Sequence, residues 1–298
     1  MYSEIARNKR KTIFLMAIFA VVILLLGWIF GQYTGSAEAG LIAAAIIATV
    51  MTLFGYFKGD SVALISTGAK QIQKRDLPQV YLIVENLTIA AGLPMPKVYV
   101  INDPSPNAFA TGRDPAHASL ALTTGLIQIM DKLELEGVIA HELAHIKNYD
   151  IRVMTIVIVL VGVILLLSDW LMRTFLFSRG RRSNDEAGQL AMFLFLAGLI
   201  LAVLSPFIAE LIKLAVSRSR EYLADASGAL LTRYPEGLAR ALEKIAQHDR
   251  PLKNANHATA HLFIANPFDP YVTKKFEHLF STHPPIMERI KKLRQIGV

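Results

Sequence analysis

The chain has 298 residues, of which 53% are hydrophobic and only 18% charged, with a formal net charge of +7. Soluble proteins carry about 25% charged residues, so this composition indicates a membrane protein. The basic residues cluster beside apolar runs, where membrane topology and anionic lipid explain them, and no nucleic-acid-binding module is evident. We therefore expect no nucleic-acid partner. The chain has no cysteine, which excludes disulfides and thiolate metal sites.

Two uncharged segments, residues 13–31 and 39–57, lie near the N-terminus, and each is 19 residues long. That length is close to the ~20 residues that span a bilayer. The first segment is longer than the core of a cleavable signal peptide, and no clean cleavage site follows it. We therefore predict that residues 1–57 form a transmembrane helix pair. The stretch 7–11 is basic, whereas the loop 32–38 has no Lys or Arg, so the positive-inside rule predicts a cytoplasmic N-terminus.

Residues 58–150 have a soluble composition. The patterns predict helices near 60–75, after Leu77-Pro78 and at 131–149, with strands at 97–101, 107–113 and 119–123. Residues 214–298 are again soluble and mainly helical, with helices at 236–247 and near the end of the chain. The expected fold class is therefore mainly α with a small β-sheet (α+β), built from 58–150 and 214–298 and joined to membrane helices.

A second hydrophobic pair, residues 153–172 and 190–211, lies between these soluble regions and is assigned to a separate segment, 151–213. The basic residues between its two halves are unfavourable for an external loop. The pair is either a transmembrane hairpin that breaks the charge rule or a membrane-associated or buried hairpin that never crosses. Length and hydropathy favour crossing.

The segment His141-Glu142-Leu143-Ala144-His145 predicts a metal site. Residues four apart share one face of a helix, so both imidazoles reach one ion, while the glutamate beside the first ligand is placed to act as general base on zinc-bound water. The alternative is a surface helix with two solvated histidines. The largely apolar stretch 135–146 argues against it, because histidines there need polar partners.

Catalytic zinc has three protein ligands and one open position. With no cysteine, the third ligand is a His, Glu or Asp, and Glu221 is the best candidate because Asp225 follows one helical turn later. Asp225 is then placed to accept a hydrogen bond from a ligand imidazole. The alternatives are an ordinary ion pair of Glu221 with Arg218 or Arg220, and a solvated Asp225.

Four motifs resemble the HtpX family of bacterial membrane metalloproteases, which are relatives of the CAAX-prenyl endopeptidases within the gluzincins. The motifs are His141-Glu142-Leu143-Ala144-His145, Ser217-Arg218-Ser219-Arg220-Glu221-Tyr222-Leu223-Ala224-Asp225, Ser281-Thr282-His283-Pro284-Pro285 and Asn107-Ala108-Phe109-Ala110-Thr111-Gly112. The resemblance implies a gluzincin-like protease domain with one Zn²⁺ per chain, held by His141, His145 and Glu221, and Glu142 as base. It also implies a multi-pass protein of the bacterial cytoplasmic membrane whose active site faces the cytoplasm. Its partners would be the lipid bilayer and polypeptide substrates, chiefly misfolded or damaged membrane proteins.

Further roles are predicted from the chemistry of peptide hydrolysis. A tetrahedral oxyanion needs a stabiliser besides zinc, and His283 or Arg289 is placed to supply it; a loop-capping role is the alternative for His283. Asn107, Ala108, Phe109 and Ala110 are expected to form an edge strand to which an extended substrate adds, the alternative being a plain hairpin edge.

The sequence is also compatible with two other classes of function. A non-enzymatic zinc-binding scaffold or sensor would keep the metal ligands without needing Glu142. A transporter would need charges within the membrane, and only Asp169 and Glu210, both at segment ends, are available. A second metal site at His257 and His261 lacks an acidic residue between the two histidines.

Overall fold

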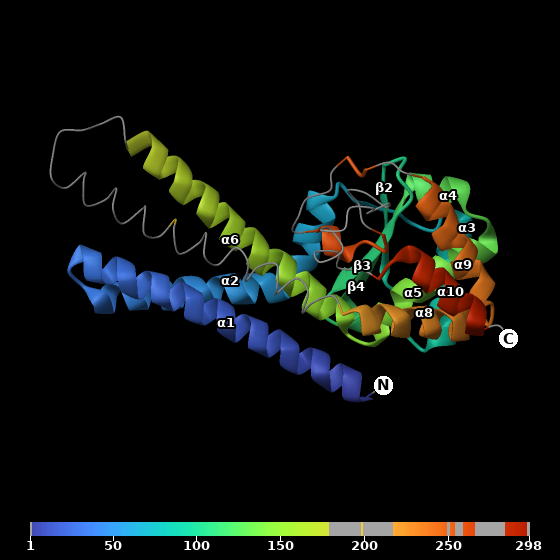
Figure 1. Ribbon diagram of the computed structural model, residues 1–298, viewed down its shortest axis with the longest axis horizontal. Coiled ribbons are helices and arrows are strands. Elements are labelled where there is room, and N and C mark those ends of the chain that lie inside the picture. Colours follow the sequence, from blue (N-terminus) through green and yellow to red (C-terminus); the bar gives the residue numbers. More distant parts are fainter. Residues whose placement is uncertain are drawn as a thin grey trace.

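The computed structural model describes residues 2–178, 198, 217–248, 251–253, 259–265 and 284–296. Three long helices, α1 (Tyr2–Thr34), α2 (Ala37–Ser66) and α6 (Asp150–Ser178), extend from one side of a domain of helices and strands (Figure 1). Within the described residues, the helices Glu4–Gln32 and Ala37–Ser66 are long and apolar enough to cross a membrane. The two helices predicted at the N-terminus are present and extend beyond the uncharged segments, while their crossing of the membrane stays a prediction.

Small residues allow α1 and α2 to pack in close contact. A Cβ atom added to Gly27 would lie 2.2 Å from the Cβ of Ala44, and one added to Gly40 would lie 2.3 Å from the carbonyl oxygen of Gly27. Further along α2, a Cβ on Gly59 would lie 2.7 Å from Cγ2 of Thr155 on α6. Such contacts are typical of membrane helices, which associate through close packing of small residues.

Large apolar side chains cover the outside of α1 and α2. Ile13, Ile42, Ile46 and Val50 are each more than half exposed. Soluble monomers rarely expose contiguous apolar surface of this kind, so the outer faces of the two helices suit lipid.

The sheet has four strands in the order β1-β2-β4-β3: β1 (Lys70–Gln71), β2 (Lys97–Ile101), β4 (Ala118–Thr123) and β3 (Ala108–Gly112). β2 and β4 are parallel, while β1 and β3 are antiparallel to their neighbours. The three strands predicted from the sequence are confirmed. β3 is an edge strand among the described elements, yet all five of its residues are buried.

Helix α5 (Lys132–Lys147) runs through the centre of the domain, packed against β3 and against α3 (Pro78–Ala91), α8 (Arg218–Thr232) and α9 (Pro235–Gln247). Asp131 caps its first turn and forms a reciprocal capping box with Glu134. Almost every residue from Leu135 to Ile146 is buried, so polar groups on this helix must be satisfied by the protein or by a ligand. The last helix, α10 (Ile286–Ile296), packs on α8 and α9.

The helix expected near 60–75 is wrong. α2 continues to Ser66, where Thr67 caps it, and Gly68, with φ of +70°, turns the chain into β1. The first half of the second hydrophobic pair is helical, since α6 covers it. Its second half, 190–211, lies outside the described residues except for residue 198. The division into domains and the crossing of the pair stay predictions.

Candidate metal centre

His141 and His145 lie one turn apart on α5, and both are buried. Their Nε2 atoms are 3.1 Å apart, and the two rings meet edge to face with centroids 4.7 Å apart. Zinc binds imidazole nitrogen at about 2.0–2.1 Å, so two nitrogens on a tetrahedral ion lie about 3.3 Å apart. The spacing of the two imidazoles therefore fits a common metal ion.

Glu221 on α8 completes a three-residue cluster. Its Oε1 lies 3.5 Å from Nε2 of His145 and its Oε2 lies 3.8 Å from Nε2 of His141. One donor atom from each residue can be chosen so that all three lie within 4.8 Å of one another. Two nitrogens and one carboxylate oxygen are a donor set typical of catalytic zinc.

A glycine allows α8 to approach α5 closely enough for this contact. A Cβ on Gly228 would lie 3.0 Å from the backbone nitrogen of His141. The two helices are thus in near backbone contact at the first histidine, and Glu221, two turns earlier on α8, faces the imidazole pair.

Glu142 lies beside the cluster but is not part of it. The side chain is buried and faces the backbone of Ala110 on β3. Burial raises the pKa of Glu142 to about 7, and the charge of Glu221 acts in the same direction against the opposing effect of His145. A carboxyl group with such a pKa can accept and release a proton near neutral pH.

Asp225 and Arg289 lie on the Nδ1 side of the His141 ring, opposite the nitrogen that faces the cluster. Oδ1 of Asp225 lies 2.9 Å from Nδ1 of His141. Arg289 on α10 binds both carboxylate oxygens of Asp225, at 2.9 and 2.7 Å, and its Nη1 lies 3.7 Å from Oε2 of Glu221. Burial alone would raise the pKa of Asp225, but Arg289 and His141 hold it at about 2. Asp225 is therefore an anion that orients the His141 ring.

The second histidine has an equivalent partner that the sequence did not reveal. Oδ2 of Asp150, the first residue of α6, lies 3.0 Å from Nδ1 of His145. Tyr149, with φ of +61°, turns the chain between the two helices and brings Asp150 back to the site. Neither spacing nor composition gave a signal for this contact, since it depends on a left-handed residue at a helix junction.

The predicted substrate strand lies beside the centre, but its own chain already uses part of it. The backbone nitrogen of Ile264 donates to the carbonyl oxygen of Ala108 at 3.0 Å, and the amide of Asn107 donates to the carbonyl oxygen of Ala265 at 3.1 Å. Phe109 is buried against Phe263 in an edge-to-face contact. His283 lies outside the described residues.

The histidine pair proposed as a second metal site is only partly described. His257 lies outside the described residues, and His261 is buried, with Nε2 3.2 Å from the carbonyl oxygen of Met154.

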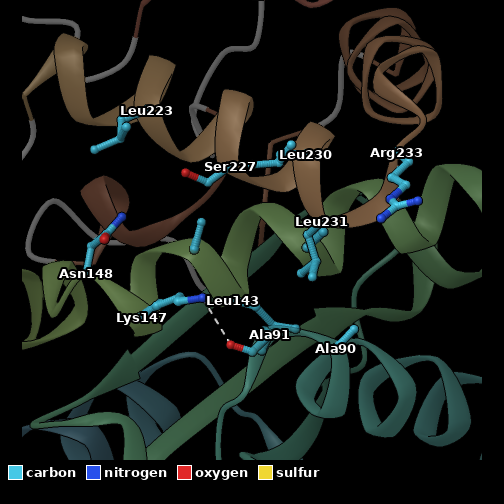
Figure 2. A pocket seen from close by; sticks show the side chains of 12 residues that line it. Ala90, Ala91, Leu143, Lys147, Asn148, Leu223, Ser227, Leu230, Leu231 and Arg233 are labelled. Carbon is cyan, nitrogen blue, oxygen red and sulfur yellow. Dashed lines mark hydrogen bonds between the residues drawn. The ribbon is translucent and has the colours of Figure 1, made fainter. Parts of the chain in front are cut away.

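A cavity of 570 Å³ lies beside the metal centre, between the end of α3, α5 and α8. Figure 2 shows Leu143 and Lys147 of α5 facing Leu223 and Leu231 across it, with Lys147 bonded to the carbonyl oxygen of Ala91 at 3.0 Å. The cavity is separate from the metal centre, because its lining does not include the three clustered residues or Glu142.

Residues 74–297 of the chain match the sequence pattern of the family described as "Peptidase family M48". The chain belongs to peptidase family M48. A Protease HtpX homolog of Dictyoglomus turgidum is 47% identical over 99% of this chain and 95% of its own length. Those of Caldanaerobacter subterraneus and Tropheryma whipplei are 45% and 46% identical, each over 100% of this chain and 98% and 99% of their own lengths. The resemblance to the HtpX family is confirmed.

A solved structure shares the fold of this M48-family chain. The crystal structure of S. mikatae Ste24p superimposes with a TM-score of 0.53 and 20% sequence identity, covering 98% of this chain and 67% of that one. The fold class predicted from the sequence is confirmed. With its family membership and two candidate membrane helices, the chain is a membrane-bound metalloendopeptidase that acts on polypeptides. The scaffold alternative is not favoured.

Proposed function

We propose that His141, His145 and Glu221 hold one Zn²⁺ per chain and that Glu142 is the general base of peptide hydrolysis. The observation that carries this assignment is the meeting of three buried donor atoms from two helices within 4.8 Å. A chain without cysteine offers zinc only nitrogen and oxygen ligands, and this cluster supplies three of them, the number that a catalytic zinc site takes from the protein.

The chemistry divides between the metal and the residues around it. When bound, zinc supplies a Lewis acid that polarises the scissile carbonyl and makes water acidic. Glu142 takes the proton of the attacking water and then passes it to the leaving amine, which its raised pKa suits. Asp225 and Asp150 each accept the Nδ1 hydrogen of one histidine, so both Nε2 atoms stay aimed at the centre.

The position of Arg289 favours a supporting role over the transition-state role expected from the sequence. Its guanidinium is buried, and its partners are Asp225, the carbonyl oxygen of Ile264 and Glu221. These contacts hold the carboxylates in place. We keep His283 as the candidate stabiliser of the oxyanion.

The substrates are proposed to be unfolded or damaged membrane proteins that bind in extended form along Asn107–Ala110. Outward-facing backbone groups of an edge strand give binding that depends little on side-chain identity, as a degrading enzyme requires. Because Ile264 occupies the carbonyl of Ala108, a peptide that pairs there has to take its place.

The catalytic domain is proposed to face the cytoplasm of a bacterial cell. Basic side chains gather where the membrane helices meet the domain. Lys9 and Arg152 both lie over the ring of Tyr149, at 4.9 and 5.0 Å from its centroid, and Arg113 lies 5.4 Å from the centroid of Phe57. Aromatic rings are enriched at both interfaces of a membrane protein, and an excess of Lys and Arg marks the cytoplasmic one, so these cations support the proposed orientation.

The test is cleavage of casein by the detergent-purified protein. The wild type is expected to cleave casein, to stop when a chelator is added and to recover when zinc is returned. Glu142→Gln is expected to keep its zinc and to lose about 10²–10⁴-fold in rate, the usual contribution of a general base. Equal cleavage by Glu142→Gln and wild type would refute the assignment of the base.

A further inference from the structure

Asn8 lies on α1, the first membrane helix, but its side chain is completely buried against the catalytic domain. Its Nδ2 donates to the carbonyl oxygen of Asn148 at 2.9 Å and to Oδ1 of Asp150 at 2.7 Å. Its Oδ1 accepts a hydrogen bond from Nη1 of Arg220 at 3.4 Å. These contacts define which way the amide points, because only its nitrogen can serve two acceptors and only its oxygen can face a guanidinium.

The partners of Asn8 lie next to the proposed metal ligands: Asn148 ends α5, Asp150 begins α6 and Arg220 lies in the first turn of α8. Asp150 binds the ring of His145 through its other oxygen, at 3.0 Å. Arg220 directly precedes Glu221 at the start of α8, and it also donates to Oδ1 of Asp150 at 3.2 Å. A single amide therefore joins the turn after α5 to the first turn of α8.

The chemistry of the site explains why an amide is needed there. Asp150 is a buried carboxylate, and such a group needs hydrogen-bond donors on both oxygens. His145 is hydrogen-bonded to Oδ2 of Asp150, while Asn8 and Arg220 both donate to Oδ1. Without Asn8, the carboxylate would be free to turn toward Arg220, and its hold on the His145 ring would weaken.

We propose that Asn8 is a positioning residue of the metal centre, which from the first membrane helix orients Asp150 and Arg220 and through them His145 and Glu221. This inference rests on the proposed function only in taking His145 and Glu221 as metal ligands. It makes α1 part of the support of the active site in addition to its role as a membrane anchor, so the geometry of the metal centre depends on how α1 is seated against the domain.

The test measures zinc affinity of the full-length chain in detergent by competition with a chromogenic chelator, in a Glu142→Gln background that prevents self-cleavage. Asn8→Leu keeps the shape and removes all three hydrogen bonds. Thr12→Val is the matched control: Thr12 is also buried on α1, one turn further on, and among the described residues its hydroxyl donates only to the carbonyl oxygen of Asn8, at 3.0 Å. Asn8→Leu is expected to weaken zinc binding about tenfold, in the range for lost outer partners of a ligand, and Thr12→Val to leave it unchanged.

A merely structural role for Asn8 is separated by a double-mutant cycle with Asp150→Ala. If Asn8 acts through Asp150, Asn8→Leu weakens binding less than about threefold in the Asp150→Ala background, because the intermediary is already gone. Unchanged affinity of Asn8→Leu, or losses that simply multiply, would overturn the proposal, as would a lowered melting temperature of the metal-free protein with zinc affinity intact.

The experiment also covers two other outcomes: a variant that does not fold and a wild type that binds no zinc. Should Asn8→Leu fail to fold, Asn8→Asp keeps the size of the side chain and sets a second carboxylate against Asp150, where the two oxygens would repel each other. It is expected to weaken zinc binding, and wild-type affinity in that variant would overturn the proposal. A wild type that binds no zinc at all would instead refute the proposed function.

Discussion

Replacement of Arg289 by methionine tests whether the buried carboxylates of the site depend on one cation. Methionine fills much of the same volume but carries no charge. Arg289 is 1% exposed and binds both oxygens of Asp225. Among the described residues, its loss leaves Asp225 with His141 as its remaining partner, and it removes the positive charge 3.7 Å from Glu221.

The expected magnitude follows from burial. Breaking a buried ion pair by removing one partner destabilises a protein by about 3–5 kcal/mol, because a charge is left buried without compensation. For a domain of this size, 1 kcal/mol corresponds to roughly 2–4 °C in melting temperature. Arg289→Met is therefore expected to lower the melting temperature of the metal-free protein by about 6–20 °C.

Arg294→Met on the same helix is the matched control. Arg294 pairs with Glu236 and Glu243, but its side chain is 45% exposed, and surface ion pairs contribute about 0–1 kcal/mol. Thermal unfolding in detergent, followed by circular dichroism, compares the two variants. Equal shifts, or loss of casein cleavage by Arg289→Met without any change in melting temperature, would refute the supporting role and favour a direct role in the transition state.

Three other predictions concern the ligands and the base. Asp150→Ala is expected to weaken zinc affinity about 10–100-fold in a chelator competition, and an unchanged affinity would show that His145 needs no orienting partner. Gly228→Ala is expected to cost about 1–3 kcal/mol and to weaken zinc binding as well, because the added methyl group meets the backbone of His141 at 3.0 Å; wild-type stability would show that α8 can move aside freely. kcat/KM is expected to fall as the pH drops below 7, since burial raises the pKa of Glu142 to about 7, bound zinc lowers it, and the base acts only when deprotonated. A rate constant that rises on acidification would contradict this.

The local part of the site could be predicted from the sequence because helical geometry determines it. His141 and His145 share a helix face at any i, i+4 spacing, and Glu142 follows from its place between them. The absence of cysteine leaves His, Glu or Asp as the third ligand, and the sequence favours Glu221 among them because Asp225 follows one helical turn later and because the motif resembles that of the HtpX family. Its contact with the histidines depends on the close approach of α8 at Gly228, which the sequence alone does not disclose.

The support of the site could not be predicted because it is assembled from distant parts of the chain. Asp150 reaches His145 only through the left-handed turn at Tyr149, and Asn8 reaches Asp150 across 142 residues of sequence. The sequence also predicts the end of α2 wrongly: the pattern beyond residue 57 is compatible with a new helix, whereas α2 continues to Ser66 and ends at the cap formed by Thr67. Hydrophobic periodicity predicts that a helix exists better than it predicts where the helix stops.

The most direct test of the metal centre is the zinc content of the purified chain, measured by plasma mass spectrometry for the wild type and for Glu221→Ala after dialysis against a weak chelator. One zinc ion per wild-type chain and much less than one per variant chain is the predicted result. Full zinc retention by Glu221→Ala would contradict the three-residue centre, and a wild type without zinc would contradict the proposed cofactor.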